Sequence, residues 1–414
     1  MPVSRSAAGP GPERAVPAGA GPSGGAAVAR FEALLAPAGQ ELLALLREAP
    51  AGPDAGLRLA TRLRARYGAD LVAGALTQHE LRLAARAKFG RALEMYFTRA
   101  GLEQASGELI ARHRARRYAG AAALADLCCG IGGDLLALAA GHPVLAVDSD
   151  PLHLRVALAN AAVLGLSEAV TPLCADVRDA PLAGVGGVFI DPARRTGRGR
   201  LRTGLSEPPL AWCLRVADTV PLVGVKAAPG LAREAVPAGW ELEFIAVGRD
   251  LKEAAAWSPA LATAPRRATI LPGGHTLVPQ PGEPVPVRAP GEFLFDPNPA
   301  VTRAAAVADL ARLLGAWQID PQIAFLSADA AASTPFARTL RVLDSAPWHQ
   351  KRLPARLREL GIGAVDIRRR GLAGDTGQLH RSLRLSGSRR ATLVMTRVQD
   401  RPWGLVCVDA GDAL

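Results

Sequence analysis

The sequence is poor in lysine, cysteine and aromatic residues. Only four of its 49 basic residues are lysines, and Phe, Trp and Tyr make up 4% of the 414 residues. Five cysteines in a chain of this length rule out a disulfide scaffold, and no CxxC pair provides metal-ligand spacing. We therefore expect free cysteines, as in the reducing cytoplasm, and no bound metal.

Long apolar runs are missing as well. A membrane span needs roughly 18 uninterrupted apolar residues, and the nearest approach, residues 135–147, is broken by His142 and Pro143. The amino-terminal segment is rich in Gly, Pro and Ala and lacks the apolar core of a secretion signal. These features indicate a cytoplasmic protein without a membrane partner.

Arginine is the residue that the chain has in excess. Its 45 arginines contribute to a net charge of +11, and residues 335–414 alone hold fifteen basic residues against seven acidic ones. A run of this kind is often only a solvated face. Because arginine forks suit phosphates and the excess is confined to one segment, the composition also favours a polyanionic partner.

The distribution of apolar residues divides the chain into five segments. A hydrophobic content of 49% over 414 residues is enough for two or three packed domains. We predict a disordered tail (1–28), a helical module (29–118), an α/β domain (119–275), a Pro-rich linker (276–298) and a basic α/β domain (299–414).

Leucines at helical spacing predict the helices of the second segment. A first helix begins near Phe31 and ends at Pro50, and a second is expected over residues 55–67. A third begins at Thr77, because Glu80 follows it at the spacing of a capping box.

From residue 121 onward, short apolar runs alternate with helical stretches. Each run is bounded by Gly, Pro or Asp, which is typical of strands buried on both faces. The alternation predicts a parallel, doubly wound sheet. Farther along we expect helices over 299–317 and 351–360, and we interpret Lys252 and Glu253 as a surface pair at a helix start.

The sharpest local signal is a glycine loop between a predicted strand and a predicted helix, with the sequence Asp126-Leu-Cys-Cys-Gly-Ile-Gly-Gly-Asp134. Glycines at such a turn let the backbone approach a ligand closely. A dinucleotide site would need a third glycine where Leu135 stands. Asp126 instead suits a ligand with a positive amino group.

Two further acids follow the next two predicted strands. Asp148 is placed where a carboxylate can accept both ribose hydroxyls of a nucleoside cofactor, as an acid does in dinucleotide folds. Asp176 is placed to accept the adenine amino group, and Val177 offers an apolar face. One such acid is usually a turn former. Three in register with successive strands indicate a site.

These residues resemble the S-adenosylmethionine site of class I methyltransferases. The resemblance implies a Rossmann-like sheet and S-adenosyl-L-methionine as cofactor. It implies cofactor contacts from residues of the glycine loop and of the two strand ends, namely Asp126, Cys128, Gly130, Gly132, Asp134, Asp148, Asp176 and Val177.

The segment Phe189-Ile-Asp-Pro-Ala-Arg-Arg195 sits where that family keeps its catalytic Asp/Asn-Pro-Pro-aromatic tetrad. With the Lys226-Ala-Ala-Pro-Gly230 segment and the basic carboxy-terminal block, the chain resembles a bacterial methyltransferase family with a THUMP-like domain. Proper THUMP domains bind RNA. The resemblance therefore implies an enzyme that acts on RNA, either tRNA or rRNA.

Four catalytic residues are expected on this basis. Asp191 and the Pro192 carbonyl can accept hydrogen bonds from an amine and orient its lone pair. Arg194 replaces the usual aromatic and can stack on a base or hold a phosphate. Lys226 is a substrate contact or a strand cap.

RNA 5-methyluridine methyltransferases share the DPAR segment but attack with a cysteine after the next strand; here Cys213 lies earlier, in a predicted helix. Direct methyl transfer to a base nitrogen is therefore favoured.

The basic carboxy-terminal segment supplies the expected RNA contacts. They are Arg338, Lys351, Arg352, Arg368, Arg369 and Arg370. Few aromatics accompany them, which favours recognition of the backbone or of an RNA end over base stacking. DNA, protein or a small molecule as substrate, and an RNA-binding protein with an idle cofactor fold, remain as alternatives.

Overall fold

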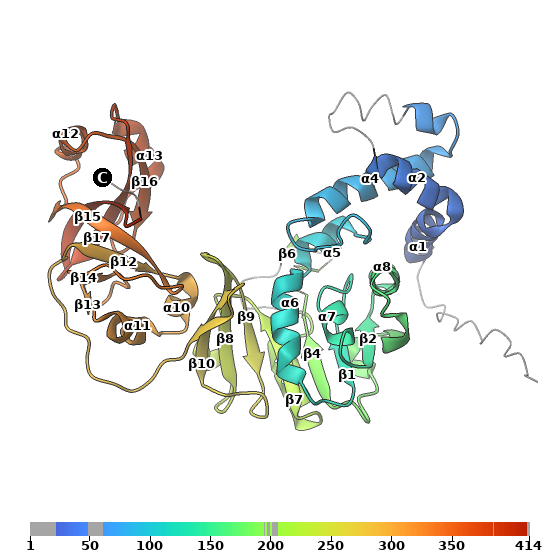
Figure 1. Cartoon of the computed structure of the whole chain (residues 1–414). Helices are drawn as coiled ribbons and strands as arrows, with labels where there is room; N and C mark the ends of the chain where they lie inside the picture. The colour runs from blue at the N-terminus through green and yellow to red at the C-terminus, as the bar shows by residue number, and fades with distance from the viewer. Residues whose placement is uncertain are drawn as a thin grey trace, which may run out of the picture. The chain divides into compact units, whose positions relative to one another are not determined.

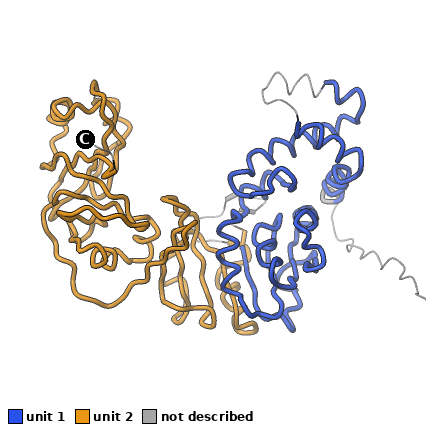
Figure 2. Tube along the Cα trace, in the orientation of Figure 1, with its two compact units in different colours: residues 1–191 blue, residues 192–414 orange. Residues whose placement is uncertain are grey.

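The computed structural model describes residues 22–48, 61–193, 195–196, 199–200, 206–383 and 385–411. The chain forms two compact units, one up to Asp191 and one from Pro192 onward (Figure 2). None of the helices in the described ranges has the length and hydropathy that crossing a bilayer requires.

The first unit opens with a helical module, drawn in blue and cyan in Figure 1. Its elements are α1 (Pro22–Leu35), α2 (Pro37–Arg47), α4 (Ala69–Ala85), α5 (Arg99–Gln104), α6 (Glu108–Ala115) and the 3-10 turn η1 (Arg116–Tyr118). Pro37 starts α2 at the first helical position, where its missing N–H costs nothing. Leu42, Leu43 and Leu46 form the buried stripe of α2, which packs against α1 and α4.

Two predictions about this module need correction, and a third is confirmed in part. Helix α1 already begins at Pro22, so the tail predicted over 1–28 is too long. Thr77 is not a helix start but lies inside α4, where its hydroxyl donates to the Ala73 carbonyl (2.9 Å). Of the second predicted helix, residues 61–64 are helical and 55–60 lie outside the described residues.

The rest of the first unit is a parallel sheet with helices between its strands. The elements are β1 (Leu124–Leu127), α7 (Leu135–Ala139), β2 (Val144–Asp148), α8 (Pro151–Val163), η2 (Ser167–Ala169), β3 (Val170–Cys174), η3 (Val177–Asp179) and β4 (Gly187–Ile190). The strand order is β3-β2-β1-β4, with every pairing parallel. All residues of β1 and β4 are buried, which explains their unbroken apolar sequences. The predicted alternation is confirmed here.

Asn160 on α8 joins the helical module to the sheet. Its buried side-chain amide accepts from the Tyr96 backbone N–H (2.7 Å) and donates to the Tyr96 carbonyl (3.0 Å). It also donates to the carbonyl of Ile131 in the glycine loop (3.0 Å). One side chain thereby satisfies three backbone groups from two separate segments.

We expect Asn160→Ala to lower the free energy of unfolding of the first unit by roughly 3 kcal/mol, because it leaves these buried backbone groups unpaired. Urea denaturation followed by circular dichroism measures the loss. Arg155→Ala on the same helix removes a half-exposed ion pair with Glu32 and should cost less than about 1 kcal/mol. Equal losses in both variants would contradict this role of Asn160.

The second unit begins with strands that continue the α/β pattern. Its first elements are β5 (Arg195–Thr196), β6 (Gly199–Arg200), α9 (Leu210–Arg215), η4 (Val216–Asp218), β7 (Leu222–Ala227), η5 (Arg233–Ala235), β8 (Glu241–Val247), β9 (Asp250–Trp257), β10 (Arg266–Leu271) and β11 (His275–Leu277). Strand β9 runs antiparallel to both β7 and β8, while β10 is parallel to β8. The sheet is therefore mixed and not wholly parallel as predicted.

The interpretation of Lys252 and Glu253 as a helix start is wrong. Both lie on β9; the Glu253 side chain is buried and Lys252 pairs with Asp250 (3.3 Å). The alternation typical of a strand is hidden in the sequence by the small, uniformly buried run Ala254–Ala256, which fits a helix equally well.

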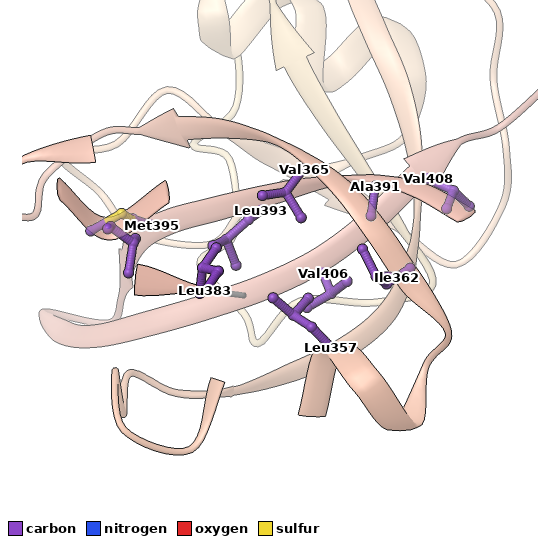
Figure 3. Packing of buried hydrophobic residues seen from close by; sticks show 10 residues of the cluster. Leu357, Ile362, Val365, Leu383, Ala391, Leu393, Met395, Val406 and Val408 are labelled. Carbon is purple, nitrogen blue, oxygen red and sulfur yellow. The ribbon is translucent and has the colours of Figure 1, made fainter. Parts of the chain in front are cut away.

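Strands β12 to β18 form a second sheet. Its elements are β12 (Phe293–Pro297), α10 (Pro299–Arg303), α11 (Val307–Leu314), β13 (Trp317–Gln318), β14 (Leu326–Ala328), β15 (Ala337–Pro347), α12 (Leu353–Glu359), β16 (Ile362–Arg369), α13 (Thr376–Ser382), β17 (Arg389–Val398) and β18 (Arg401–Asp409). The strand order is β13-β14-β12-β15-β18-β17-β16. Buried side chains from α12, β16, α13, β17 and β18 form one of its cores, shown in Figure 3.

Two boundaries in this region differ from expectation. The predicted helix over 299–317 is split into α10 and α11, and Ala305 between them has a left-handed backbone (φ 58°). The predicted linker over 276–298 is shorter, because β11 ends at Leu277 and β12 begins at Phe293.

Candidate cofactor site and active site

The glycine loop fills the turn between β1 and α7. Cys128, Gly130 and Gly132 all have positive φ angles (63°, 55° and 94°). A Cβ at Gly130 would meet no atom within 4 Å, so the space above this residue is open. Left-handed backbone at the non-glycine Cys128 is costly and is found mostly at functional sites. Because α7 has only five residues, the loop backbone rather than a long helix dipole is what a ligand would meet.

Asp148 holds this loop in place. At the end of β2 its carboxylate accepts from the Gly130 N–H and from the Asp150 N–H, each at 2.8 Å. Burial raises the pKa of Asp148, although these two backbone hydrogen bonds act in the opposite direction. The predicted ribose acid therefore also shapes the glycine loop.

Asp126 is the most unusual group of the site. Its side chain is 0% exposed, and within the described part of the chain neither carboxylate oxygen has a hydrogen-bond partner. Burial, reinforced by Asp134 and Asp191, holds the pKa of Asp126 well above its ordinary range, against the influence of Arg114. An unpaired buried carboxylate is expensive, and a cation beside it would remove that cost.

Arg114 on α6 is a residue of this site that the sequence did not reveal. It is buried, forms an ion pair with Asp134 and lies with its guanidinium 4.7 Å from the centre of the Phe189 ring. In the sequence it belongs to the run Arg112-His-Arg-Ala-Arg-Arg117, which looks like a solvated face. Asp134 thus faces a protein cation.

Asp191 follows β4 directly and lies beside the glycine loop. Its backbone N–H donates to the carbonyl of Leu127, the last residue of β1 (3.1 Å). Its side chain is half-buried and Pro192 is buried. Asp126, Asp134, Asp148 and Asp191 therefore gather at the carboxyl edge of the parallel strands, with the guanidinium of Arg114 among them. This edge is strongly acidic.

Asp176 and Val177 come after β3 at the same edge. The exposed Asp176 carboxylate accepts from the Arg178 N–H (2.9 Å) and pairs with the Arg178 guanidinium (3.0 Å), while Val177 is buried.

Lys226 belongs to the second unit, where it is 6% exposed on β7 opposite Ala255 of β9. Cys213 is buried in α9, as predicted. Arg194 lies outside the described residues.

Comparison with known proteins connects these features to a family. Family models match three parts of the chain: a domain of unknown function (27–85), RNA cap guanine-N2 methyltransferase (121–203) and a THUMP domain-like module (337–408). An uncharacterized S-adenosylmethionine-dependent methyltransferase of Mycobacterium tuberculosis, found alike in strains CDC 1551 and H37Rv, is 37% identical over 353 residues. The match covers 81% of this chain and 95% of the relative. The chain belongs to this methyltransferase family.

The fold of this chain is similar to that of a methyltransferase whose crystal structure is known. The crystal structure of a candidate methyltransferase from Porphyromonas gingivalis W83 superposes with a TM-score of 0.71 at 20% identity, covering 90% of this chain and 98% of that one. The expected class is therefore confirmed: a helical amino-terminal region, a Rossmann-like α/β fold and a THUMP-like carboxy-terminal domain.

The residues of the acidic edge fit the cofactor of this family. S-Adenosylmethionine carries a positive amino group and a positive sulfonium, and Asp126 is a buried carboxylate without a described partner. The open space above Gly130 leaves room for close backbone approach. The negative charge of the edge thus suits the positive groups of the ligand, and the space above Gly130 lets the ligand lie close to the backbone.

The predicted RNA-binding residues divide into two groups. Arg338 pairs with Asp409 and Arg370 with Asp296, whereas Lys351, Arg352, Arg368 and Arg369 are exposed. The structure adds Arg249, from the turn between β8 and β9, which also pairs with Asp296 (2.8 Å). Burial lowers the pKa of Arg249, and although Asp296 opposes this, Arg368, Arg338 and Arg370 lower it further. We call Arg249, Arg338, Arg368 and Arg370 the arginine cluster.

We expect the ligand-free methyltransferase to become less stable as the pH rises above the ordinary pKa of an aspartate. Because the Asp126 pKa is raised in the folded state, the folded chain holds a proton that the unfolded chain has lost. Asp126→Asn should flatten this slope and raise the unfolding free energy near neutral pH by roughly 1–2 kcal/mol. Thermal melts between pH 4 and pH 8 measure both effects.

Asp179→Asn changes an exposed carboxyl of the same unit and serves as the control, with melting curves that follow the unmodified protein. A slope that persists unchanged in Asp126→Asn would show that Asp126 is not the buried acid responsible.

Proposed function

We propose that the protein transfers the methyl group of S-adenosylmethionine directly to a base nitrogen of RNA, either tRNA or rRNA, without a covalent enzyme intermediate. The observation that carries this proposal is the position of Asp191. A hydrogen bond from its backbone joins it to the last residue of β1, at the start of the glycine loop. An acceptor for a substrate amine thereby stands beside the loop of the cofactor.

The cofactor roles follow from charge and burial. Asp126 receives the amino group of the cofactor, which gives its buried carboxylate the partner it lacks. Gly130 and Gly132 allow close approach, and the left-handed turn at Cys128 shapes the loop. Asp148 accepts the ribose hydroxyls while it orders the loop. Asp134 acts through Arg114, with which it is paired.

The adenine end of the cofactor meets the segment after β3. Asp176 accepts the adenine amino group, for which its exposed carboxylate must share or release Arg178. Val177 is buried and presents an apolar surface beside it. These two assignments rest on position at the strand end, which is where class I methyltransferases hold the adenine.

For catalysis the protein has to align the substrate nitrogen with the methyl group and exclude water. It does not need to form a covalent bond itself. The sulfonium makes the methyl group transferable with a good leaving group. Asp191 and the Pro192 carbonyl accept hydrogen bonds from the substrate nitrogen and orient its lone pair toward the methyl carbon. The bound cofactor would supply the methyl group and leave as a neutral thioether, and Asp191 accepts the proton that the methylated nitrogen then loses. We assign Arg194 and Lys226 to contacts with the substrate.

Two observations support RNA as the substrate. The family models that match the chain are described as an RNA cap guanine-N2 methyltransferase and as THUMP-like. The carboxy-terminal domain also carries exposed basic side chains, including Arg368 and Arg369 on β16. Arginine forks match phosphate oxygens in geometry as well as charge.

We expect Asp191→Ala to lower the rate of methyl transfer to RNA by about 10²-fold or more, since the substrate amine loses its acceptor. Binding of S-adenosylmethionine, measured by calorimetry, should stay unchanged. Asp191→Asn is the matched variant, because an asparagine also occurs in the family tetrad, and it should keep part of the activity. Transfer of tritiated methyl groups into total RNA gives the rates. Full activity of Asp191→Ala would refute the assignment.

We expect Arg368→Ala to weaken RNA binding about threefold, similarly for all sequences, and to lower the slope of log K against log salt by about 1. Arg358→Ala changes an exposed arginine of α12 outside the arginine cluster. It should have a smaller effect on the RNA affinity and on the salt slope. Fluorescence anisotropy with labelled tRNA between 50 and 200 mM salt measures the slopes. If the full-length protein binds RNA with no salt dependence, or binds DNA and RNA alike, the RNA assignment fails.

A further inference from the structure

The first unit contains a pocket that none of the four acids of the acidic edge lines. It is a pocket of about 730 Å³ between the helical module and α7, in the size range of pockets that hold small molecules. Its apolar wall includes Phe89, Met95 and Leu136, all of them buried. Leu109 on α6 lines it as well and is 39% exposed. None of the predicted cofactor or catalytic residues lines this pocket.

The charged side chains of the pocket are mostly cationic. Arg86, Lys88, Arg91 and Arg112 line it together with the single carboxylate of Glu108. This arrangement surrounds an apolar wall with positive charge.

The existing partners leave part of this charge uncompensated. Arg112 pairs with Glu108, Arg91 pairs with Glu94, and the Lys88 ammonium donates to backbone carbonyls at the end of α5, among them Leu102 (2.6 Å). The guanidinium of Arg86 is exposed, and among the described residues it forms neither a hydrogen bond nor an ion pair. The pocket therefore retains a cation available to an anionic ligand.

An apolar wall and an available guanidinium suit a ligand that combines a flat ring with a phosphate. We propose that this pocket holds a nucleotide of the RNA substrate outside the methylated position, with its base against Phe89 and Met95 and its phosphate toward Arg86. The proposal rests on the proposed function, since RNA is the source of the nucleotide. Arginine pairs well with phosphate oxygens, and base stacking on aromatic side chains is tolerant of sequence.

The pocket shares its wall with the cofactor loop. Gly133 lines the pocket, and a Cβ there would come within 3.2 Å of the Ser106 backbone N and O. Helix α6 supplies Arg112 to the pocket and Arg114 to Asp134 of the glycine loop; Figure 1 shows α6 beside α7. RNA seated in the pocket would thus contact the same helix that orders the cofactor loop.

The test uses the full chain with S-adenosylhomocysteine at saturation, so that the adenosine site is filled. Nucleoside 5′-monophosphates and the matching nucleosides are titrated by calorimetry. We expect the monophosphates to bind at least tenfold more tightly than the nucleosides. Arg86→Gln should abolish that preference, while Arg116→Gln, at an exposed arginine of η1 that does not line the pocket, should retain it.

Filling the pocket provides an independent check. Ala137→Trp on α7, or Ala140→Trp at its end if the first variant does not fold, places an indole in the space and should weaken monophosphate binding at least tenfold. Unchanged binding of S-adenosylhomocysteine reports an intact fold.

Monophosphate binding that is absent at millimolar concentrations, or that neither the arginine nor the tryptophan variant weakens, would overturn the proposal. Failure of the proposed function has a different signature. In that case the unmodified enzyme methylates no RNA, whatever the monophosphate titrations show. If both proposals hold, Arg86→Gln raises the KM for RNA severalfold and leaves the affinity for S-adenosylmethionine unchanged.

Discussion

The carboxylate of Asp126 is the constraint on which the cofactor half of this protein depends. It is fully buried at the carboxyl end of β1 and is surrounded by Asp134, Asp148 and Asp191. Among the described residues the Asp126 carboxylate has no hydrogen-bond partner, and an unpaired buried charge costs several kcal/mol. The positive amino group of the cofactor would offset this cost. Binding and local stability are therefore two aspects of one electrostatic arrangement.

The helical module contributes directly to that arrangement. Arg114 of α6 provides the cation that pairs with Asp134, and Asn160 of α8 joins Tyr96 to the glycine loop. The pocket between the module and α7 is lined by Gly133 of the same loop. The amino-terminal helices thus complete the site, and a methyltransferase domain cut at residue 119 would lose its arginine and expose its loop.

Acidic and basic side chains gather at separate sites within each unit's own fold. The first unit collects acids at the end of its parallel strands, where a cationic cofactor binds. The second unit carries exposed arginines on β16 together with the arginine cluster, where the guanidinium groups of Arg249 and Arg370 share the carboxylate of Asp296. The acidic edge suits the positive groups of the cofactor, and exposed arginines suit a polyanionic partner such as the proposed RNA.

The sequence by itself predicted the fold class and the position of the glycine loop, because periodic apolar runs and glycine spacing are local signals. The family entered as a resemblance carried by the glycine loop and the segment around Asp191. The sequence also located Asp126, Asp148 and Asp191, since acids at successive strand ends meet at one edge. It failed for β9, whose small buried residues fit a helix equally well, and for Thr77, whose capping pattern lies inside α4. Only the tertiary structure revealed Arg114 and Arg249, because neither the burial of Arg114 nor the ion pair of Arg249 with the distant Asp296 can be deduced from the local sequence. The Asp126 carboxylate became exceptional for the same reason: burial and the lack of a partner are properties of the packed chain, not of its sequence.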